Sequence, residues 1–186
     1  MAATKELFLT ICHDMQQPVS YIPRALLAAA VFLLCICLYR KIAGVQEKTG
    51  AKKLCLWFFC VFYTVILLNM VFFSREPGSR TGVDLTLLGT WGETARSRGF
   101  VIENILLFIP AGVLLPCVFR PLKKGLACVL AGCFFSIGIE LTQLVMKTGY
   151  CQLDDVVMNT IGTGVGWGMY RTAAYFAKPA SGRIQE

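Results

Sequence analysis

One stretch of the sequence, residues 136–168, combines long apolar runs with side chains that could do chemistry. These side chains are carboxylates, amides and a hydroxyl: Ser136, Glu140, Gln143, Asp154, Asp155 and Asn159. Ionisable groups inside an apolar segment of membrane length are costly, so they usually face the interior of a helix bundle or a wet cavity. Two carboxyls in such a site can also be driven to different protonation states, which acid–base catalysis needs. The stretch is therefore the candidate site, and Glu140 and Asp155 would be the catalytic residues of an enzyme.

Helical spacing distributes these polar residues over two faces. One face carries residues 136, 140, 143 and 147, and the next helix carries residues 155, 159, 162 and 166 on one side. Gly162 and Gly166, like Gly164 and Gly168, are glycines four apart, a spacing that lets two membrane helices approach closely. We expect the last helix to pack tightly, with its polar end beside the helix before it.

The elements that position these residues are predicted to be membrane spans. The chain has 186 residues, of which 56% are hydrophobic, and a mean hydropathy of +0.62, too apolar for an ordinary soluble domain. The predicted fold is all-α, a polytopic membrane helical bundle forming a single domain over residues 1–186. Five transmembrane helices are expected, at residues 22–39, 54–73, 101–119, 125–146 and 156–177. The long outer loop 74–100 contains Trp91, which could anchor it at the membrane interface.

The basic residues predict the orientation of these spans. Of the 18 lysines and arginines, 11 fall in the segments 40–53, 120–124 and 171–186. The positive-inside preference places these segments in the cytoplasm, with the N-terminus out and the C-terminus in. The strongly polar groups of the spans then lie in the outer half of the membrane. We expect a ligand-binding site there that also includes Arg75, Glu103 and Asn104, which stand at the outer ends of the second and third spans.

Several functional classes are not indicated by the sequence. The net charge of +7 comes from short basic runs between apolar spans, with no motif for binding nucleic acid. The nine cysteines lack paired metal-ligand spacing and there is a single histidine, so we expect no zinc site and no cofactor and assign no metal ligands; binding of a hard cation by the carboxylates is left open. Only Cys12 and Cys151 would face outside, which leaves one disulfide conceivable.

Three blocks of sequence resemble the VanZ-like family of bacterial membrane proteins. These are ENILLFIPAGVLLP at residues 103–116, SIGIELTQL at 136–144 and LDDVVMNTIGTGVG at 153–166. The family's motif residues match at Asn104, Pro110, Gly112, Ser136, Glu140, Gln143, Asp155, Asn159 and Gly162. The resemblance reaches back through Arg75 and covers nearly the whole chain.

The resemblance implies a multi-pass protein of the cell envelope, since the family's namesake is associated with resistance to the acylated glycopeptide teicoplanin. The chain departs from the family where members often carry an arginine before the paired acids, because Tyr150 and Cys151 stand there. If that arginine partners a carboxylate, Arg75 or Lys147 must replace it here, or the site is altered.

Three functions are compatible with these features. In the first, the outward polar site binds an amphiphile, such as an acylated glycopeptide or a cell-wall lipid, without catalysis. In the second, Glu140 and Asp155 perform acid–base chemistry on a lipid-linked substrate. In the third, the chain is a transporter or a partner subunit, and a homodimer could supply the missing half of a transport path. A plainer alternative makes Glu140 and Gln143 a buried strut between helices, and Asp154 and Asp155 a solvated helix cap.

Overall fold

The computed structural model describes residues 2–14, 16–45, 49–73, 78, 82–89, 91–92 and 94–177. The chain divides into two compact units, Met1–Pro77 and Gly78–Glu186, and each is described by itself. The described residues are helical apart from turns and two short strands, so the predicted all-α class is confirmed. That the two units make up one membrane domain over residues 1–186 stays a prediction.

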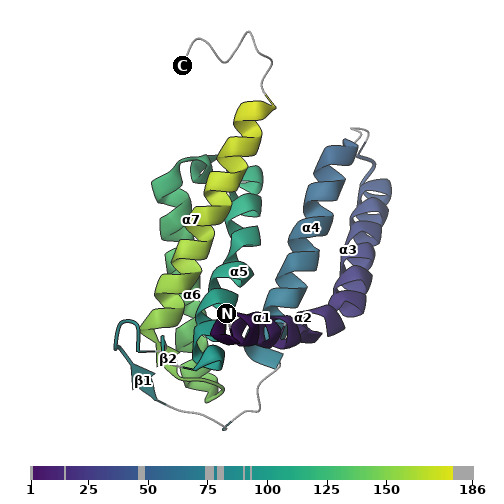
Figure 1. Cartoon of the computed structure of the whole chain (residues 1–186). Coiled ribbons are helices and arrows are strands. Elements are labelled where there is room, and N and C mark those ends of the chain that lie inside the picture. Colours follow the sequence, from purple (N-terminus) through teal and green to yellow (C-terminus); the bar gives the residue numbers. More distant parts are fainter. Residues whose placement is uncertain are drawn as a thin grey trace. The chain divides into compact units, whose positions relative to one another are not determined.

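In its described residues, the first unit contains four α-helices. They are α1 (Ala2–Asp14), α2 (Gln16–Ser20), α3 (Ile22–Ile42) and α4 (Ala51–Leu68), and α4 runs on as a π-helical turn, Asn69–Phe73. The sequence predicted no element ahead of residue 22, where α1 and α2 lie. α3 and α4 lie side by side (Figure 1). Two small residues one helical turn apart on α3, Ala25 and Ala29, are fully buried.

The second unit is built on three long helices. They are α5 (Ala95–Val118), α6 (Gly125–Met146) and α7 (Leu153–Phe176), and α7 packs against both of the others (Figure 1). The strands β1 (Val83–Asp84) and β2 (Cys151–Gln152) pair in parallel, with Asp84 opposite Gln152. α6 occupies the residues predicted for it. α5 begins inside the segment expected to be loop, because Thr94 caps it by accepting a hydrogen bond from the Ser97 amide at 3.1 Å.

Glycine allows the backbones of α5 and α7 to approach closely. A β-carbon on Gly162 would collide with the carbonyl oxygen of Ile105, and one on Gly166 would collide with that of Ile109. The predicted tight packing of the last helix is therefore observed, and its partner at these glycines is α5. The second glycine pair is different, because a β-carbon on Gly168 would meet nothing within 4 Å.

Among the described residues, four helical stretches are long and apolar enough to cross a membrane. They are Thr4–Ile42, Ala51–Phe73, Ala95–Val118 and Gly125–Met146. α7 has 24 residues and is long enough, but its acids, amide and glycines make it less apolar than these four. The structure thus provides four candidate spans where the sequence predicted five, and a crossing by α7 stays a prediction.

Candidate functional site

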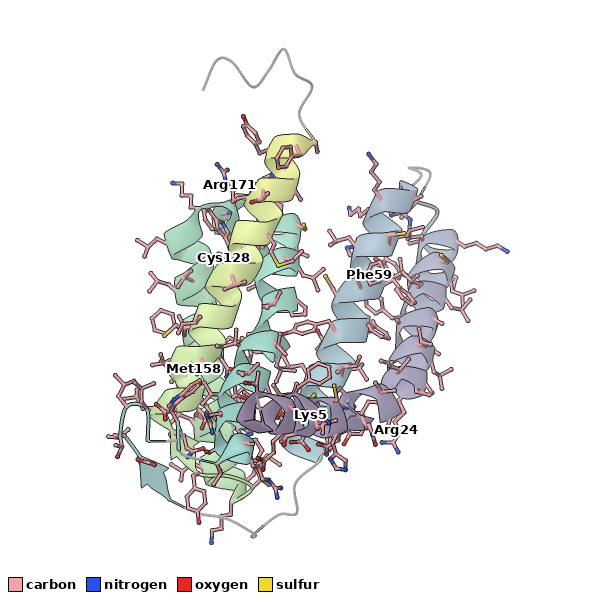
Figure 2. The ribbon with its side chains drawn as sticks, viewed as in Figure 1. Lys5, Arg24, Phe59, Cys128, Met158 and Arg171 are labelled. Atoms are coloured by element: carbon pink, nitrogen blue, oxygen red, sulfur yellow. The ribbon has the colours of Figure 1, made fainter. Side chains whose placement is uncertain are left out.

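The predicted site residues of the second unit gather at one end of its helix bundle. Asn104 lies in the first half of α5, Glu140 near the end of α6 and Asp155 at the start of α7. Because successive helices run in opposite directions, these three positions meet at the same end, which also carries β1 and β2. Figure 2 shows Met158 of α7 toward this end and Arg171 at the opposite one. We call Asn104, Ser136, Glu140, Asp154, Asp155 and Asn159 the polar cluster.

Two hydrogen bonds of the polar cluster join α7 to its neighbours. The Asn104 side-chain amide donates to the Asp155 carboxylate at 2.6 Å, which links α5 to α7. One turn further along α7, the Asn159 amide donates to the Ser136 hydroxyl at 2.8 Å, which links α7 to α6. The polar end of α7 therefore lies beside α6, as predicted, and it is bonded to α5 as well.

Two further hydrogen bonds come from backbone amides. The Gln152 amide donates to the Glu140 carboxylate at 3.0 Å, and the Leu88 amide donates to the Asp154 carboxylate at 2.5 Å. Asp154 is only 2% exposed and Glu140 only 3%. The solvated cap considered for Asp154 is therefore wrong, because its carboxylate is enclosed by the loop that contains Leu88. A buried carboxylate needs such donors, since removing it from water is otherwise costly.

The turn after α6 brings the Gln152 amide back to Glu140. Lys147 ends the helix in a left-handed conformation, with φ of 55°, which is unfavourable for a residue with a side chain. The Thr148 amide donates to the Gln143 carbonyl at 3.0 Å and closes the turn. The chain then folds back along the end of α6 into β2. Lys147 itself is exposed, and within the part of the chain described it forms no ion pair with the cluster.

Asn159 holds an acceptor that the described residues leave unused. Its side chain is 4% exposed, and its Oδ1 atom has no hydrogen-bond partner among them. A buried polar atom of this kind calls for an explanation, such as a water, an ion or a ligand. The Asn159 oxygen is therefore a place where a donor group of a ligand could bind.

Two predicted site residues that the structure describes, Glu103 and Gln143, take no part in these four hydrogen bonds. Glu103 is half-buried on α5 beside Asn104, and Gln143 is 2% exposed on α6. Arg75 lies outside the described residues. The ligand-binding role of the whole set, like a catalytic role for Glu140 and Asp155, stays a prediction.

The thiol of Cys151 lies close enough to the cluster for its pKa to depend on the charge of Glu140. The pKa of the thiol is raised, mainly by burial and also by the negative charge of Glu140. Cys151 and Cys12 are both free thiols in the structure. In the described residues no group of three or more histidines, cysteines, aspartates and glutamates could hold a metal ion. The cluster is a set of hydrogen-bond donors and acceptors.

Sequence reasoning missed the parts of the cluster that come from backbone. The Leu88 and Gln152 amides carry no side-chain signal, and the loop and turn that present them have no helical period. It also missed Thr163, which is fully buried where α7 meets Gly132 of α6 and donates to the Asn159 carbonyl at 3.0 Å. The position of Thr163, one turn after Asn159 on the same helix, could have revealed it.

A helical membrane protein with a polar cluster at one end of its helix bundle is the class that this fold and site define. The family model described as VanZ/LLP1 matches residues 55–175. The chain belongs to the VanZ/LLP1 family and is a multi-pass membrane protein. The match begins within α4 and therefore covers less of the chain than the resemblance, which was expected to cover nearly all of it. The first predicted span, residues 22–39, lies outside the match. Searches of curated proteins and of solved structures found no match.

Proposed function

We propose that this membrane protein binds the polar head of an amphiphile at the polar cluster, on the outer side of the membrane. The observation that carries the proposal is the convergence of Glu140, Asp155 and Asn159, from two helices of an apolar bundle, at one end of it. Neighbouring apolar helices would contact the acyl part of the ligand. An acylated glycopeptide and a lipid-linked cell-wall precursor both combine such a head with such a tail.

The exposure pattern of α7 supports its crossing the membrane as a fifth span. Its most buried side chains include Asp154, Asn159 and Thr163, whereas large apolar side chains one turn apart are exposed: Ile161, Val165 and Met169. Soluble helices show the reverse pattern. The low average hydropathy of α7 therefore comes from residues directed into the bundle, and the face left for lipid is apolar.

The distribution of charge supports the outward orientation of the cluster. In the second unit the basic turn Arg120–Lys123 and Arg171 lie at the end opposite to the polar cluster. Among the described residues, the cluster end carries three basic residues, Arg96, Arg98 and Lys147, against four at the opposite end, Arg120, Lys123, Lys124 and Arg171. The positive-inside preference favours the end with more of them in the cytoplasm. The cluster then faces the outer leaflet, where cell-wall lipids and glycopeptides are found.

Binding is favoured over catalysis by the way in which the two carboxylates are held. Glu140 accepts from the Gln152 amide and Asp155 accepts from the Asn104 amide. Each carboxylate is thus oriented by a donor group of the protein and serves as a fixed acceptor, as a binding site requires. Intramembrane catalysis and a transporter or partner-subunit role remain the alternatives.

The test is resistance to teicoplanin in a susceptible Gram-positive host that expresses the protein, with vancomycin as the glycopeptide that lacks an acyl tail. We expect wild type to protect selectively against teicoplanin, and Glu140→Gln to lose the protection at equal membrane abundance. The glutamine keeps an acceptor for the Gln152 amide and removes only the charge. Thr142→Val, at an exposed position of the same helix, is the control and should protect like wild type. Protection by Glu140→Gln equal to that by wild type would contradict the proposed site.

A further inference from the structure

The loop that covers Asp154 exposes an unusual number of large apolar side chains. Within ten residues, five of them are between 50% and 69% exposed: Val83, Leu85, Leu87, Leu88 and Trp91. Contiguous exposed apolar surface of this kind marks contact with a protein partner or with a membrane. Figure 1 shows β1, where this loop starts, at the end of the second unit that carries β2. We call residues 82–89 with Trp91 the apolar loop.

Several backbone amides of the apolar loop are engaged in turns within the loop. The Thr86 amide donates to the Asp84 side chain at 2.9 Å, and the Trp91 amide donates to the Leu88 carbonyl at 3.1 Å. The Gly89 amide donates to the Thr86 carbonyl at 3.4 Å. Irregular backbone can approach lipid only when its donors and acceptors are engaged, because lipid offers no replacement partners. Two apolar residues of the loop have their amides engaged in this way, Leu88 by the Asp154 carboxylate and Trp91 by the Leu88 carbonyl.

The apolar loop is also attached to the helix bundle at several points. The Cys151 amide donates to the Gly82 carbonyl at 2.9 Å, and β1 pairs with β2. The Tyr150 ring packs on Gly82 so closely that a β-carbon there would lie 2.7 Å from it. At the far end of the loop, the Leu88 amide is bound by the buried Asp154 carboxylate. These contacts hold the apolar side chains at the polar end of the bundle.

We propose that the apolar loop is a membrane anchor that lies in the lipid interface of the leaflet beside the polar cluster. The lipid bilayer is the partner that fits best, because α6 and α7 of the same unit also expose large apolar side chains and because Trp91 is of the type that prefers the interface. Leu88 then has two roles, since its side chain contacts lipid and its amide fixes Asp154. This anchoring requires that the second unit is embedded in a membrane, and it does not require that the polar cluster binds a ligand.

The test compares two kinds of labelling on the full-length wild-type protein in phospholipid vesicles. A hydrocarbon-soluble diazirine labels side chains in contact with lipid, hydroxyl radicals label side chains in contact with water, and mass spectrometry locates both. We expect the apolar loop to be labelled by the diazirine as strongly as the exposed face of α6, and several-fold more than the basic turn Arg120–Lys123. Trp91 should resist oxidation.

Two results would overturn the anchor. Diazirine labelling of the loop no stronger than that of the basic turn, with rapid oxidation of Trp91, would place the loop in water. Protection of Trp91 from both reagents would mean that protein covers the loop. Asp154→Ala should increase Trp91 oxidation severalfold, because it removes the acceptor of the Leu88 amide. Asp154→Asn keeps an acceptor and should not increase it. Equal oxidation in both variants would refute the claim that Asp154 holds the loop in place.

Discussion

At the scale of single residues, the cluster depends on polar groups that have been removed from water. Ser136 is fully buried and Asn159 is 4% exposed, and the bond between them joins α6 to α7. Losing one partner leaves the other buried and unsatisfied, which costs more than the bond itself contributes. Such residues therefore stabilise the helix contact as well as defining the site.

Ser136→Ala is expected to lower the free energy of unfolding by about 1 kcal/mol, because it leaves the Asn159 amide without its acceptor. The measurement is unfolding of the purified protein in mild detergent with increasing denaturing detergent. Thr172→Ala on α7 is the control, since that exposed hydroxyl bonds only to the Gly168 carbonyl of its own helix. Equal stability of Ser136→Ala and wild type would show that the bond contributes nothing.

The charge of Glu140 can be read from the reactivity of Cys151. Only the thiolate is alkylated, and the raised pKa of Cys151 means that less thiolate is present at a given pH. Its alkylation rate should therefore rise at a higher pH than that of an exposed thiol. Glu140→Gln removes the smaller of the two causes, so the pKa of Cys151 should fall part of the way toward the ordinary value. Rates of maleimide labelling between neutral and alkaline pH measure the pKa of Cys151, with Cys151→Ser as the blank. If the pH profile of Glu140→Gln equals that of wild type, Glu140 carries no charge.

At the scale of elements, periodicity in the sequence predicted the long helices well, but it did not predict every helix end or which helices pack against each other. The limits of α6 match the expected 125–146 because an apolar run fills it between a basic turn and Lys147. The start of α5 was missed because Thr94 caps a first turn of polar residues that reads as loop. Helical spacing predicted the faces that carry Glu140 and Asn159, whereas the backbone donors of Leu88 and Gln152 depend on tertiary folding that spacing does not encode.

The two glycine pairs of α7 offer a matched comparison. Gly162→Ala is expected to destabilise the protein by about 2 kcal/mol or more, because its β-carbon would collide with the Ile105 carbonyl, and overpacking of a close contact is costly. Gly168→Ala adds the same methyl group in open space and should change stability by less than about 1 kcal/mol, in the stabilising direction, since alanine favours helix. Thermal unfolding in detergent measures both. Equal effects of the two substitutions would contradict the close crossing of α5 and α7.

At the scale of the whole molecule, the decisive question is whether α7 crosses the membrane. Composition alone includes four helical stretches as candidates and leaves α7 out. The burial of its polar residues explains this, because an average over a helix does not distinguish the face that meets lipid from the face that meets protein.

Cysteine labelling from outside tests the crossing and the orientation together. A membrane-impermeant maleimide should label Cys151 in intact cells, slowly because its pKa is raised. Ala177→Cys, just beyond the end of α7, should be labelled only after the cells are permeabilised. If both positions react in intact cells, α7 does not cross the membrane, and if only residue 177 reacts, the orientation is reversed.

The most direct test of the central claim is binding of teicoplanin to the purified protein in lipid nanodiscs, with vancomycin as the ligand without an acyl tail. We expect wild type to bind teicoplanin saturably and vancomycin weakly. Glu140→Gln and Asn159→Leu should lose the binding of teicoplanin, whereas the control Thr142→Val should bind it like wild type. The same assay with a lipid-linked cell-wall precursor covers the other ligand class. If the two cluster variants fold and bind both acylated ligands as tightly as wild type does, the polar cluster is not a binding site and its hydrogen bonds serve only to join the helices.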